Sequence, residues 1–272
     1  MDPELLAFAE DPAAFIRVGP DEERVATERA VLTFSPGAHF WSTQVARVRF
    51  GVGGIAAELD GIRSLMRSRE RTAAVWSIGP SATPFDLADR LTALGVERES
   101  DDGSSILVLT DEPSAGPSTF DVRLVTTFDD HLAAIEVGNE GFGFPGEDAD
   151  DERRRARATF EAERDGDHTV RLLASDEGRP VAVGRAWFAP QGVYLGGVAT
   201  IPSHRRRGAM ASVIAAAWSE AVQRRTPALV AWGGEMSTSG LTRLGFGKVG
   251  QVHLLIDRLD AFRRATGSHR TR

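Results

Sequence analysis

The spacing of apolar residues in the second half of the chain changes repeatedly between two periods. Alternation every second residue, or a short apolar run between turn residues, predicts a strand, and apolar residues three or four positions apart predict a helix. The predicted strands are FDVRLVTT (120–127), HTVRLLAS (168–175), RPVAVGRAWFA (179–189), QGVYLGGVAT (191–200), PALVAWGG (227–234) and KVGQVHLLI (248–256). The predicted helices are DDHLAAIEVGNEGFG (129–143), EDADDERRRARATFEAE (147–163), the alanine-rich run after Gly208, and STSGLTRLG (237–245).

The first half of the chain also mixes the two kinds of element. The predicted strands are ERAVLTF (28–34), TQVARVRF (43–50), AAVWSI (73–78) and SSILVLT (104–110), and the predicted helices are IAAELDGIRSLMRS (55–68) and TPFDLADRLTAL (83–94). The glycines of RFGVGG (49–54) lack the G-x-G-x-x-G spacing of a dinucleotide-binding turn, so they predict a turn before a helix. The whole pattern is typical of a mixed α/β protein.

A composition change divides the chain. DEPSAGPST (111–119) places two prolines, a glycine and three hydroxyl residues after a strand, which predicts a linker between domains at 1–115 and 120–272. The two halves also share a short motif, because LTALGV (91–96) and LTRLGF (241–246) agree at four of six positions. Each motif lies at the end of a predicted helix and places a glycine at its C-cap. The match hints at a duplicated unit.

Composition and charge narrow the functional classes. The 272 residues carry a net charge of −7, with a pI near 5.5, which disfavours general nucleic-acid binding. There is no cysteine, so thiolate nucleophiles and cysteine-ligated metals are excluded. The six histidines lack paired ligand spacing, so no metal is expected: they are His39, His131, His168, His204, His253 and His269. No basic leader and no membrane-length apolar run occurs, so we expect a cytoplasmic protein without a membrane partner.

The strand-to-helix turn in GGVATIPSHRRRGAMASVIAAAW (196–218) predicts an anion site. A helix that begins after a tight turn directs free backbone N–H groups and partial positive charge at its N-terminus, and glycine lets a phosphate come close. Arg205, Arg206 and Arg207 add charge that can bind phosphates. Three solvated arginines are the alternative, although a helix N-terminus is the less favourable end for cations. The turn lacks the spacing of a Walker loop.

The turn resembles the acetyl-CoA pyrophosphate loop of the GNAT acetyltransferase superfamily, Q/R-x-x-G-x-G/A, at Arg205 and Gly208. The likeness extends from about 120 to 258, where LTRLGF resembles the closing helix-glycine-aromatic segment. The first half resembles the degenerate partner domain of tandem GNAT proteins. The resemblance implies two tandem domains, each a mixed β-sheet flanked by helices. It also implies that acetyl-CoA binds along Val198, Ala199 and Thr200, with its pyrophosphate at Arg205, Arg206, Arg207, Gly208, Ala209, Met210 and Ala211.

Three positions depart from the family pattern. Met210 replaces the second small residue of the loop, Leu241 stands where many members carry a tyrosine general acid, and Gly234 replaces a frequent asparagine. The remaining candidates for chemistry are Glu235, after a predicted strand, as base, and Tyr194, the only tyrosine, as proton donor. Structural roles are equally open for both: Glu235 as a first-turn helix acid, and Tyr194 as a half-buried strand aromatic.

The acceptor of the acetyl group is expected to be an amine of a small molecule or peptide. Glu140, Phe142 and Phe144 lie where the family builds its acceptor loop, although two aromatics could equally order the loop itself. A homodimer stays open as the assembly. Two other functions compete with an N-acetyltransferase: a non-catalytic acyl-CoA-binding module with a regulatory first half, and, less favoured by the acidity, a nucleic-acid binder that uses HRRRG.

Overall fold

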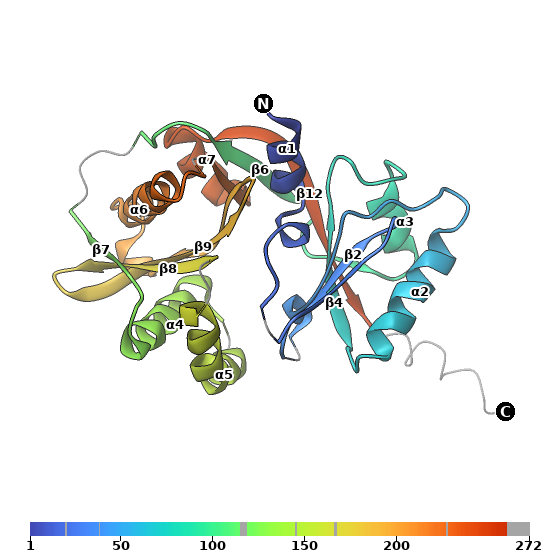
Figure 1. Ribbon diagram of the computed structural model, residues 1–272, viewed down its shortest axis with the longest axis horizontal. Helices are drawn as coiled ribbons and strands as arrows, with labels where there is room; N and C mark the ends of the chain where they lie inside the picture. The colour runs from blue at the N-terminus through green and yellow to red at the C-terminus, as the bar shows by residue number, and fades with distance from the viewer. Residues whose placement is uncertain are drawn as a thin grey trace. The chain divides into compact units, whose positions relative to one another are not determined.

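Met1–Ala9 and Leu107–Val249 fold together as one unit, and Glu10–Ile106 folds with the segment that begins at Gly250 as another. The computed structural model describes residues 1–19, 21–37, 39–114, 119–144, 146–165, 168–226 and 228–259 (Figure 1). The two units are therefore interleaved along the chain, and strands β6 and β12 each have residues in both. The division at 1–115 and 120–272 stays a prediction about domains, and four residues of its linker, 115–118, lie outside the described residues.

The first unit is a sheet covered by helices on both faces (Figure 1). Its helices are α1 (Pro3–Glu10), α4 (Phe128–Phe142), α5 (Gly146–Asp165), α6 (Ala209–Gln223) and α7 (Glu235–Arg243), with a 3₁₀ turn at Pro202–His204. Its strands are β6 (Ser104–Leu109), β7 (Asp121–Leu124), β8 (Thr169–Asp176), β9 (Arg179–Ala189), β10 (Gly192–Thr200) and β11 (Leu229–Gly233), in the order β6-β11-β10-β9-β8-β7.

Alternation along β9 decides which helix packs on which face of this sheet. A Cβ atom at Gly184 would lie 2.6 Å from Val213 of α6, whereas Val183, its neighbour, lies on the opposite face beside Gly138 of α4. Because successive strand residues point to opposite faces, α4 and α6 cover opposite sides of the sheet. Glycine at 184 lets α6 lie directly on the strand. The apolar face of each helix and both faces of β9 form one core.

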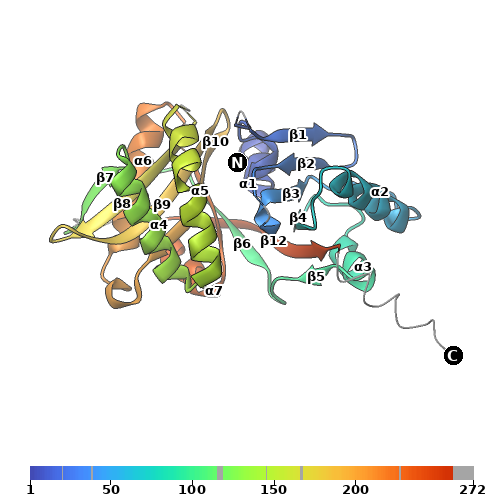
Figure 2. The same ribbon diagram turned by 90° about the horizontal axis from the view of Figure 1, so that it is seen from below.

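The second unit is built on a smaller mixed sheet. Its strands are β1 (Glu23–Ala26), β2 (Val31–Phe34), β3 (Thr43–Ala46), β4 (Ala73–Ile78), β5 (Glu97–Arg98) and most of β12 (Gly247–Arg258), and its helices are α2 (Ile55–Arg67) and α3 (Leu87–Ala93), with 3₁₀ turns at Pro12–Ala14 and Phe40–Ser42. The order is β1-β2-β3-β4-β12, with β5 paired to β12 (Figure 2). Trp76, Leu59 and Met66 centre its core.

The two units repeat one arrangement. In each, two parallel strands are joined by a helix: β3, α2 and β4 in the second unit, and β10, α6 and β11 in the first. The shared LTALGV and LTRLGF motifs end α3 and α7, where Gly95 and Gly245 adopt φ of 89° and 102°. A strand follows each motif. Left-handed backbone of this kind favours glycine at a helix end, which explains the shared residue.

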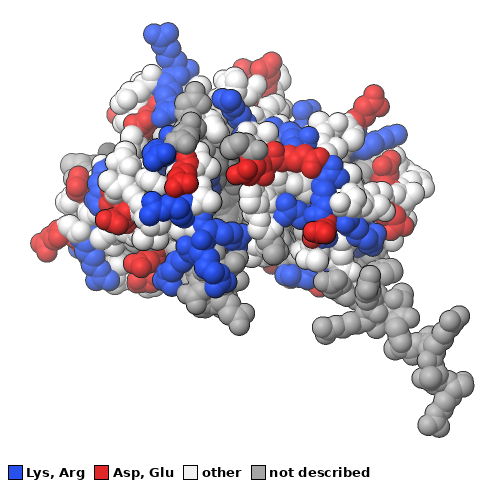
Figure 3. Space-filling view, turned by 60° about the horizontal axis from the view of Figure 1, so that its bottom comes forward, with Lys and Arg blue, Asp and Glu red and all other residues white. Residues whose placement is uncertain are grey.

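The predicted elements correspond closely to the observed ones, with two kinds of difference. Helix α3 begins at Leu87 rather than near Thr83, because the backbone of Thr83 bonds with Val48 and Phe50 instead. Helix α1 and strand β1 are additional, and each is short. Acidic and basic side chains are interspersed over the face drawn in Figure 3, as the mixed charge of the sequence leads one to expect.

Candidate functional site

The turn between β10 and α6 has the backbone geometry of an anion site. Gly208 is the N-cap of α6 with φ of 98°, and no side chain caps this helix end. The first helical hydrogen bond runs from the Ser212 N–H to the Gly208 carbonyl, at 3.0 Å. The N–H groups of Ala209, Met210 and Ala211 therefore lack an intrahelical acceptor. Together with the helix dipole, these groups favour a bound anion.

The three arginines of the turn have three different environments. Arg205 donates to the backbone carbonyls of Thr200, at 3.3 Å, and Gly141, at 2.7 Å. Arg207 pairs with Asp176 at 3.0 Å, and His204 Nε2 lies 3.2 Å from the same carboxylate. Arg206 is exposed, has φ of 62°, and makes no hydrogen bond or ion pair with any described residue. As far as the described residues go, Arg206 is therefore the arginine of this turn that can rotate toward a ligand without breaking a contact.

Strands β10 and β11 pair over a short stretch and then part. Their parallel register runs from Val193 opposite Leu229 to Leu195 opposite Ala231. Strand β10 continues to Thr200 and keeps its pairing with β9, after an irregularity between Gly196 and Ala199. Among the described residues, the backbone edge of Val198, Ala199 and Thr200 that faces away from β9 has no strand beside it. An extended ligand with amide groups could add to such an edge.

Met210 is accommodated by a contact between two helices. Its side chain is half-buried and packs against the core, and a Cβ atom at Gly240 of α7 would lie 2.9 Å from its terminal methyl group. Ala209 is buried and Ala211 is half-buried, so both remain small where α6 begins. The methionine therefore fills space between α6 and α7. Methionine can replace the small residue of the family pattern at position 210 because Gly240, on the neighbouring helix, leaves room for its side chain.

Glu235 and Tyr194 occupy different levels of the sheet. Glu235 is exposed and is the first residue of α7. Tyr194 is half-buried, lies opposite Val230 of β11, stacks on Trp187 at 5.7 Å between ring centroids, and meets Trp232 edge-on at 5.7 Å. Val230 precedes Glu235 by five residues, which spans up to about 16 Å in extended chain. Burial raises the pKa of the Tyr194 phenol above its usual value, so this group stays protonated.

The structure shows the surroundings of Leu241 and Gly234, the two departures from the family pattern that lie at helix α7. Leu241 is 6% exposed and belongs to the core of the first unit, so this position of α7 contributes packing. Gly234 is exposed and is the N-cap of α7, and a Cβ atom there would have no heavy atom within 4 Å. The site that remains for polar chemistry at the start of α7 is Glu235 itself.

The predicted acceptor loop presents an aromatic surface. Phe142 and Phe144 are about half exposed and stack with 5.5 Å between ring centroids, and Glu140 is exposed. Glu140 and Phe142 lie in the last turn of α4 rather than in a loop, and the helix ends at a left-handed Gly143 with φ of 69°. Gly141 packs against β10, since a Cβ atom there would lie 2.8 Å from Ala199. The contact joins this last turn to the strand end that leads into the arginine turn.

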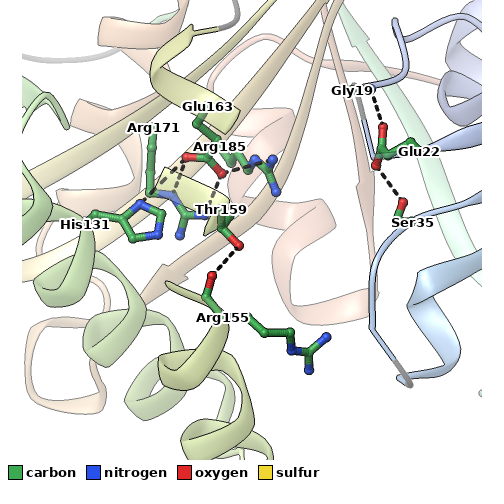
Figure 4. Close-up of polar contacts among 9 residues, drawn as sticks. All are labelled: Gly19, Glu22, Ser35, His131, Arg155, Thr159, Glu163, Arg171 and Arg185. Carbon is green, nitrogen blue, oxygen red and sulfur yellow. Dashed lines mark hydrogen bonds and ion pairs between the residues drawn. The ribbon is translucent and has the colours of Figure 1, made fainter. Parts of the chain in front are cut away.

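Sequence reasoning missed a buried ion cluster between α4, α5 and the sheet. Glu163 of α5 pairs with Arg171 at 2.9 Å and Arg185 at 3.0 Å, and His131 lies 3.8 Å from the same carboxylate (Figure 4). Desolvation, together with the charges of Arg171 and Arg185, lowers the pKa of His131 to about 4, and Glu163 opposes the shift only in part. The two arginines also hold the pKa of Glu163 below its usual value. The ion cluster fixes α5 to the sheet. The sequence offered little sign of it, because its three charged residues are up to 22 positions apart and lie on one helix and two different strands.

Neither a metal site nor a membrane span emerges from the described residues. Over these ranges no group of three or more His, Asp or Glu side chains could hold a metal ion. His269 lies outside the described residues. Within the same part of the chain, no helix is both long and apolar enough to cross a membrane.

Part of the first unit matches a known protein family. Residues 131–246 match the model of the acetyltransferase (GNAT) family. No curated protein matches the chain by sequence. The fold is similar to a GCN5-related N-acetyltransferase from Kribbella flavida, with a TM-score of 0.68, 18% identity, and coverage of 93% of this chain and 94% of that one. It is also similar to a functionally unknown conserved protein from Staphylococcus epidermidis, with a TM-score of 0.65, 11% identity, and coverage of 88% of this chain and 94% of that one. A third similar structure is a tandem GNAT protein from the clavulanic acid biosynthesis pathway, with a TM-score of 0.59, 15% identity, and coverage of 94% of each chain.

Proposed function

Because the chain contains a GNAT-family domain at 131–246 within a tandem GNAT fold, we propose that it transfers an acetyl group from acetyl-CoA directly to an amine. The observation that carries the proposal is the uncapped start of α6 beside Gly208, where three backbone N–H groups and Arg206 favour a diphosphate. Acetyl-CoA supplies that diphosphate. Its pantetheine arm has the length and the amide groups to follow the open edge of Val198, Ala199 and Thr200.

The chemistry requires a new C–N bond and loss of the C–S bond. The amine must lose a proton, and the departing sulfur must gain one or remain a thiolate. In this proposal Glu235, exposed at the start of α7, takes the proton from the amine, directly or through water. At the sulfur, the phenol of Tyr194 serves as donor; because burial raises its pKa, it stabilises the departing sulfur by a hydrogen bond more readily than by full proton transfer. The two residues thus have distinct roles, one at the nitrogen and one at the sulfur.

The acceptor would meet the enzyme at the C-terminal end of α4. The stacked Phe142 and Phe144 offer an apolar surface, and Glu140 beside them offers a negative charge. This combination suits an amine that carries an apolar group, because the cation can approach the carboxylate while the apolar part covers the rings. The protein would act without a metal.

Non-catalytic binding of acyl-CoA remains the competing function, and the buried Leu241 favours it, since the usual acid is missing from α7. A screen of amine acceptors with acetyl-CoA, in which release of free thiol is measured, separates the two functions. Acceptor-dependent thiol release supports the transferase. Saturable acetyl-CoA binding by calorimetry without thiol release for any amine supports the binding module, and absence of binding contradicts both.

Binding can be checked independently by thermal melting. A ligand held only by the native state adds RT ln(1 + [L]/Kd) to stability, about 2.7 kcal/mol at a hundredfold excess over Kd. Acetyl-CoA at millimolar concentration should therefore raise the melting temperature of the ligand-free protein by several degrees. A folded, ligand-free sample whose melting temperature does not move would remove the basis of both functions.

A further inference from the structure

Three aromatic side chains from neighbouring strands of the first unit pack in one row. Trp187 of β9 stacks on Tyr194 of β10 with 5.7 Å between ring centroids, and Trp232 of β11 meets the same tyrosine edge-on at 5.7 Å. Trp187 lies directly opposite Tyr194 in the sheet, and Trp232 is two residues beyond Val230, the partner of Tyr194 on β11. Alternation along each strand therefore places all three rings on one face of the sheet.

Each end of this aromatic row, Trp187, Tyr194 and Trp232, is held by a polar contact. The guanidinium Cζ of Arg185 lies 4.4 Å from the centroid of the Trp187 ring, and the same guanidinium pairs with Glu163 of α5 at 3.0 Å (Figure 4). At the other end, the indole N–H of Trp232 donates to the backbone carbonyl of Ala9 at 2.8 Å, in the last turn of α1. Helix α1 and the ion cluster thus both fix the two tryptophans.

The phenol in the middle of the row is held by its ring and not by its hydroxyl group. Gly196 leaves room for the rings, because a Cβ atom there would lie 2.8 Å from Trp187 and 3.2 Å from Tyr194. The Tyr194 hydroxyl makes no hydrogen bond with any residue that the structure describes. A buried tyrosine hydroxyl usually has a partner in the protein. The row therefore orients the ring and leaves the hydroxyl to a ligand.

Tyr194 lies where β10 and β11 separate. Their parallel pairing ends at Leu195 and Ala231, one residue beyond Tyr194. In the proposed function the diphosphate of acetyl-CoA binds at the arginine turn, and the pantetheine arm runs back along β10 from Thr200 to Val198. An arm in that direction brings its sulfur end toward the point where the strands separate, and so toward the phenol.

We infer that Trp187 and Trp232 are positioning residues, which hold the phenol of Tyr194 toward the sulfur of acetyl-CoA. The inference rests on the proposed function, in which that phenol donates to the departing sulfur. A donor that is already oriented when charge develops on the sulfur requires no reorganisation during the step. Because Ala9 fixes the indole of Trp232, helix α1 also becomes part of the site, although it lies far outside the family match at 131–246.

The first test needs no turnover, because Tyr194 is the only tyrosine and its ionisation can be followed by the absorbance of the phenolate. Trp187→Leu and Trp232→Leu should each let water reach the ring. The phenol should then ionise about one pH unit or more below the wild type, while circular dichroism shows a folded chain. Trp187→Phe, which keeps the stack, should ionise as the wild type does. If a leucine variant does not fold, the methionine variant is measured in the same way.

Trp218 provides the matched control. It is a half-buried tryptophan of α6 that packs against the same core. Helix α6 covers the face of β9 to which Gly184 belongs, and Trp187, three residues later, lies on the other face. Trp218→Leu should therefore leave the ionisation of Tyr194 unchanged.

The second test is a double-mutant cycle with an acceptor found in the screen. Tyr194→Phe should lower kcat by about 10- to 100-fold and Trp187→Leu by about tenfold, with acetyl-CoA affinity by calorimetry within about twofold of the wild type. The variant that combines both changes should be no slower than Tyr194→Phe alone, because the tryptophan acts only through the phenol. Trp232→Phe, which keeps a ring but loses the bond to Ala9, should lower kcat less than Trp232→Leu does.

Four outcomes overturn the inference. An unchanged ionisation of Tyr194 in both leucine variants would refute it while the proposed function stands. Additive losses of kcat in the cycle would do the same, since the tryptophans would then act apart from the phenol. A full kcat for Tyr194→Phe would remove the phenol, and the positioning role with it, from acetyl transfer. A wild type that transfers acetyl to no amine fails the proposed function itself, and the positioning role falls with it.

Discussion

Arg205 and Gly141 lie 64 positions apart in the sequence and are joined by a hydrogen bond of 2.7 Å, from the guanidinium Nη2 to the backbone carbonyl oxygen. The same guanidinium bonds to the Thr200 carbonyl through Nε. Arg205 therefore ties the last turn of α4 to the end of β10. Its predicted role as a phosphate ligand stays a prediction, and Arg206, which makes no contact of this kind with the described residues, is the simplest of the three to test.

Arg206→Gln should weaken CoA binding by about 5- to 30-fold, because an exposed charge-assisted contact to a phosphate contributes about 1–2 kcal/mol. The CoA affinity of the variant should also depend less steeply on salt concentration, since one fewer cationic contact to the phosphates is screened. Arg225→Gln is the matched control: Arg225 is likewise exposed, has φ of 59°, and follows the opposite end of α6. Equal CoA affinities for the two variants, measured by calorimetry at two salt concentrations, would show that Arg206 does not meet the phosphates.

Gly208→Asp should abolish measurable CoA binding, because a carboxylate would replace the close approach of backbone N–H groups to the diphosphate. Any side chain at φ of 98° is also strained, by about 1–2 kcal/mol, so the variant should melt at a lower temperature.

Gly95→Asp separates these two effects. Gly95 has φ of 89°, open space around a Cβ atom, and a place in the second unit. It should show a similar loss of stability with CoA affinity unchanged. Retained affinity in Gly208→Asp would mean that CoA binds elsewhere.

Glu235→Gln tests the base. If Glu235 accepts the proton of the amine, turnover of an acceptor found in the screen should fall by about 10² to 10⁴, with CoA affinity nearly intact and the acidic limb of the pH profile lost. If Glu235 only complements the dipole of α7, the cost is about 0.3–1 kcal/mol of stability and turnover is unchanged. Asp129→Asn, at an exposed acid in the first turn of α4, should show that second behaviour. Equal rates for wild type and Glu235→Gln at several pH values would shift the base to Glu140 or to water.

His131 should make the folded state sensitive to acid. Its pKa is about 4 in the folded protein and 6.5 in the unfolded chain, so the unfolded state alone takes up the proton as the pH falls from 6.5 to 4. Stability should therefore decrease over that window, by about 3 kcal/mol in total for this group. Burial is the main reason that the native protein resists this protonation, Arg171 and Arg185 add to it, and Glu163 opposes it only in part.

The check is a series of urea unfolding curves between pH 7 and 4.5 for the wild type and His131→Gln. The difference in unfolding free energy between the two proteins should shrink or reverse as the pH falls, because glutamine takes up no proton. A pH-independent difference would show that the native protein protonates His131 as readily as the unfolded chain does.

The sequence by itself determined most of the elements and the glycine turn at which we predict anion binding. Strand β9 was predicted at its observed limits, 179–189, and α2, β4 and β10 within one residue, because alternation and helical spacing are local properties of the chain. The glycine at the start of α6 and the Leu-Gly helix ends could be interpreted for the same reason, since turn chemistry acts over a few residues. The GNAT resemblance rested on these local features, and the family match at 131–246 bears it out.

Tertiary structure decided how each polar residue is used. Three consecutive arginines look equivalent in sequence, but Gly141 engages Arg205, Asp176 engages Arg207, and Arg206 remains exposed. The burial of Leu241 and the ion cluster around Glu163 depend on residues of other helices and strands, which lie from eight to 32 positions away in the case of Glu163. The interleaving of the two units along the chain is equally non-local. Hydrogen bonds and ion pairs are short-ranged in space but not in sequence, so only the folded chain determines which charges are free for a ligand.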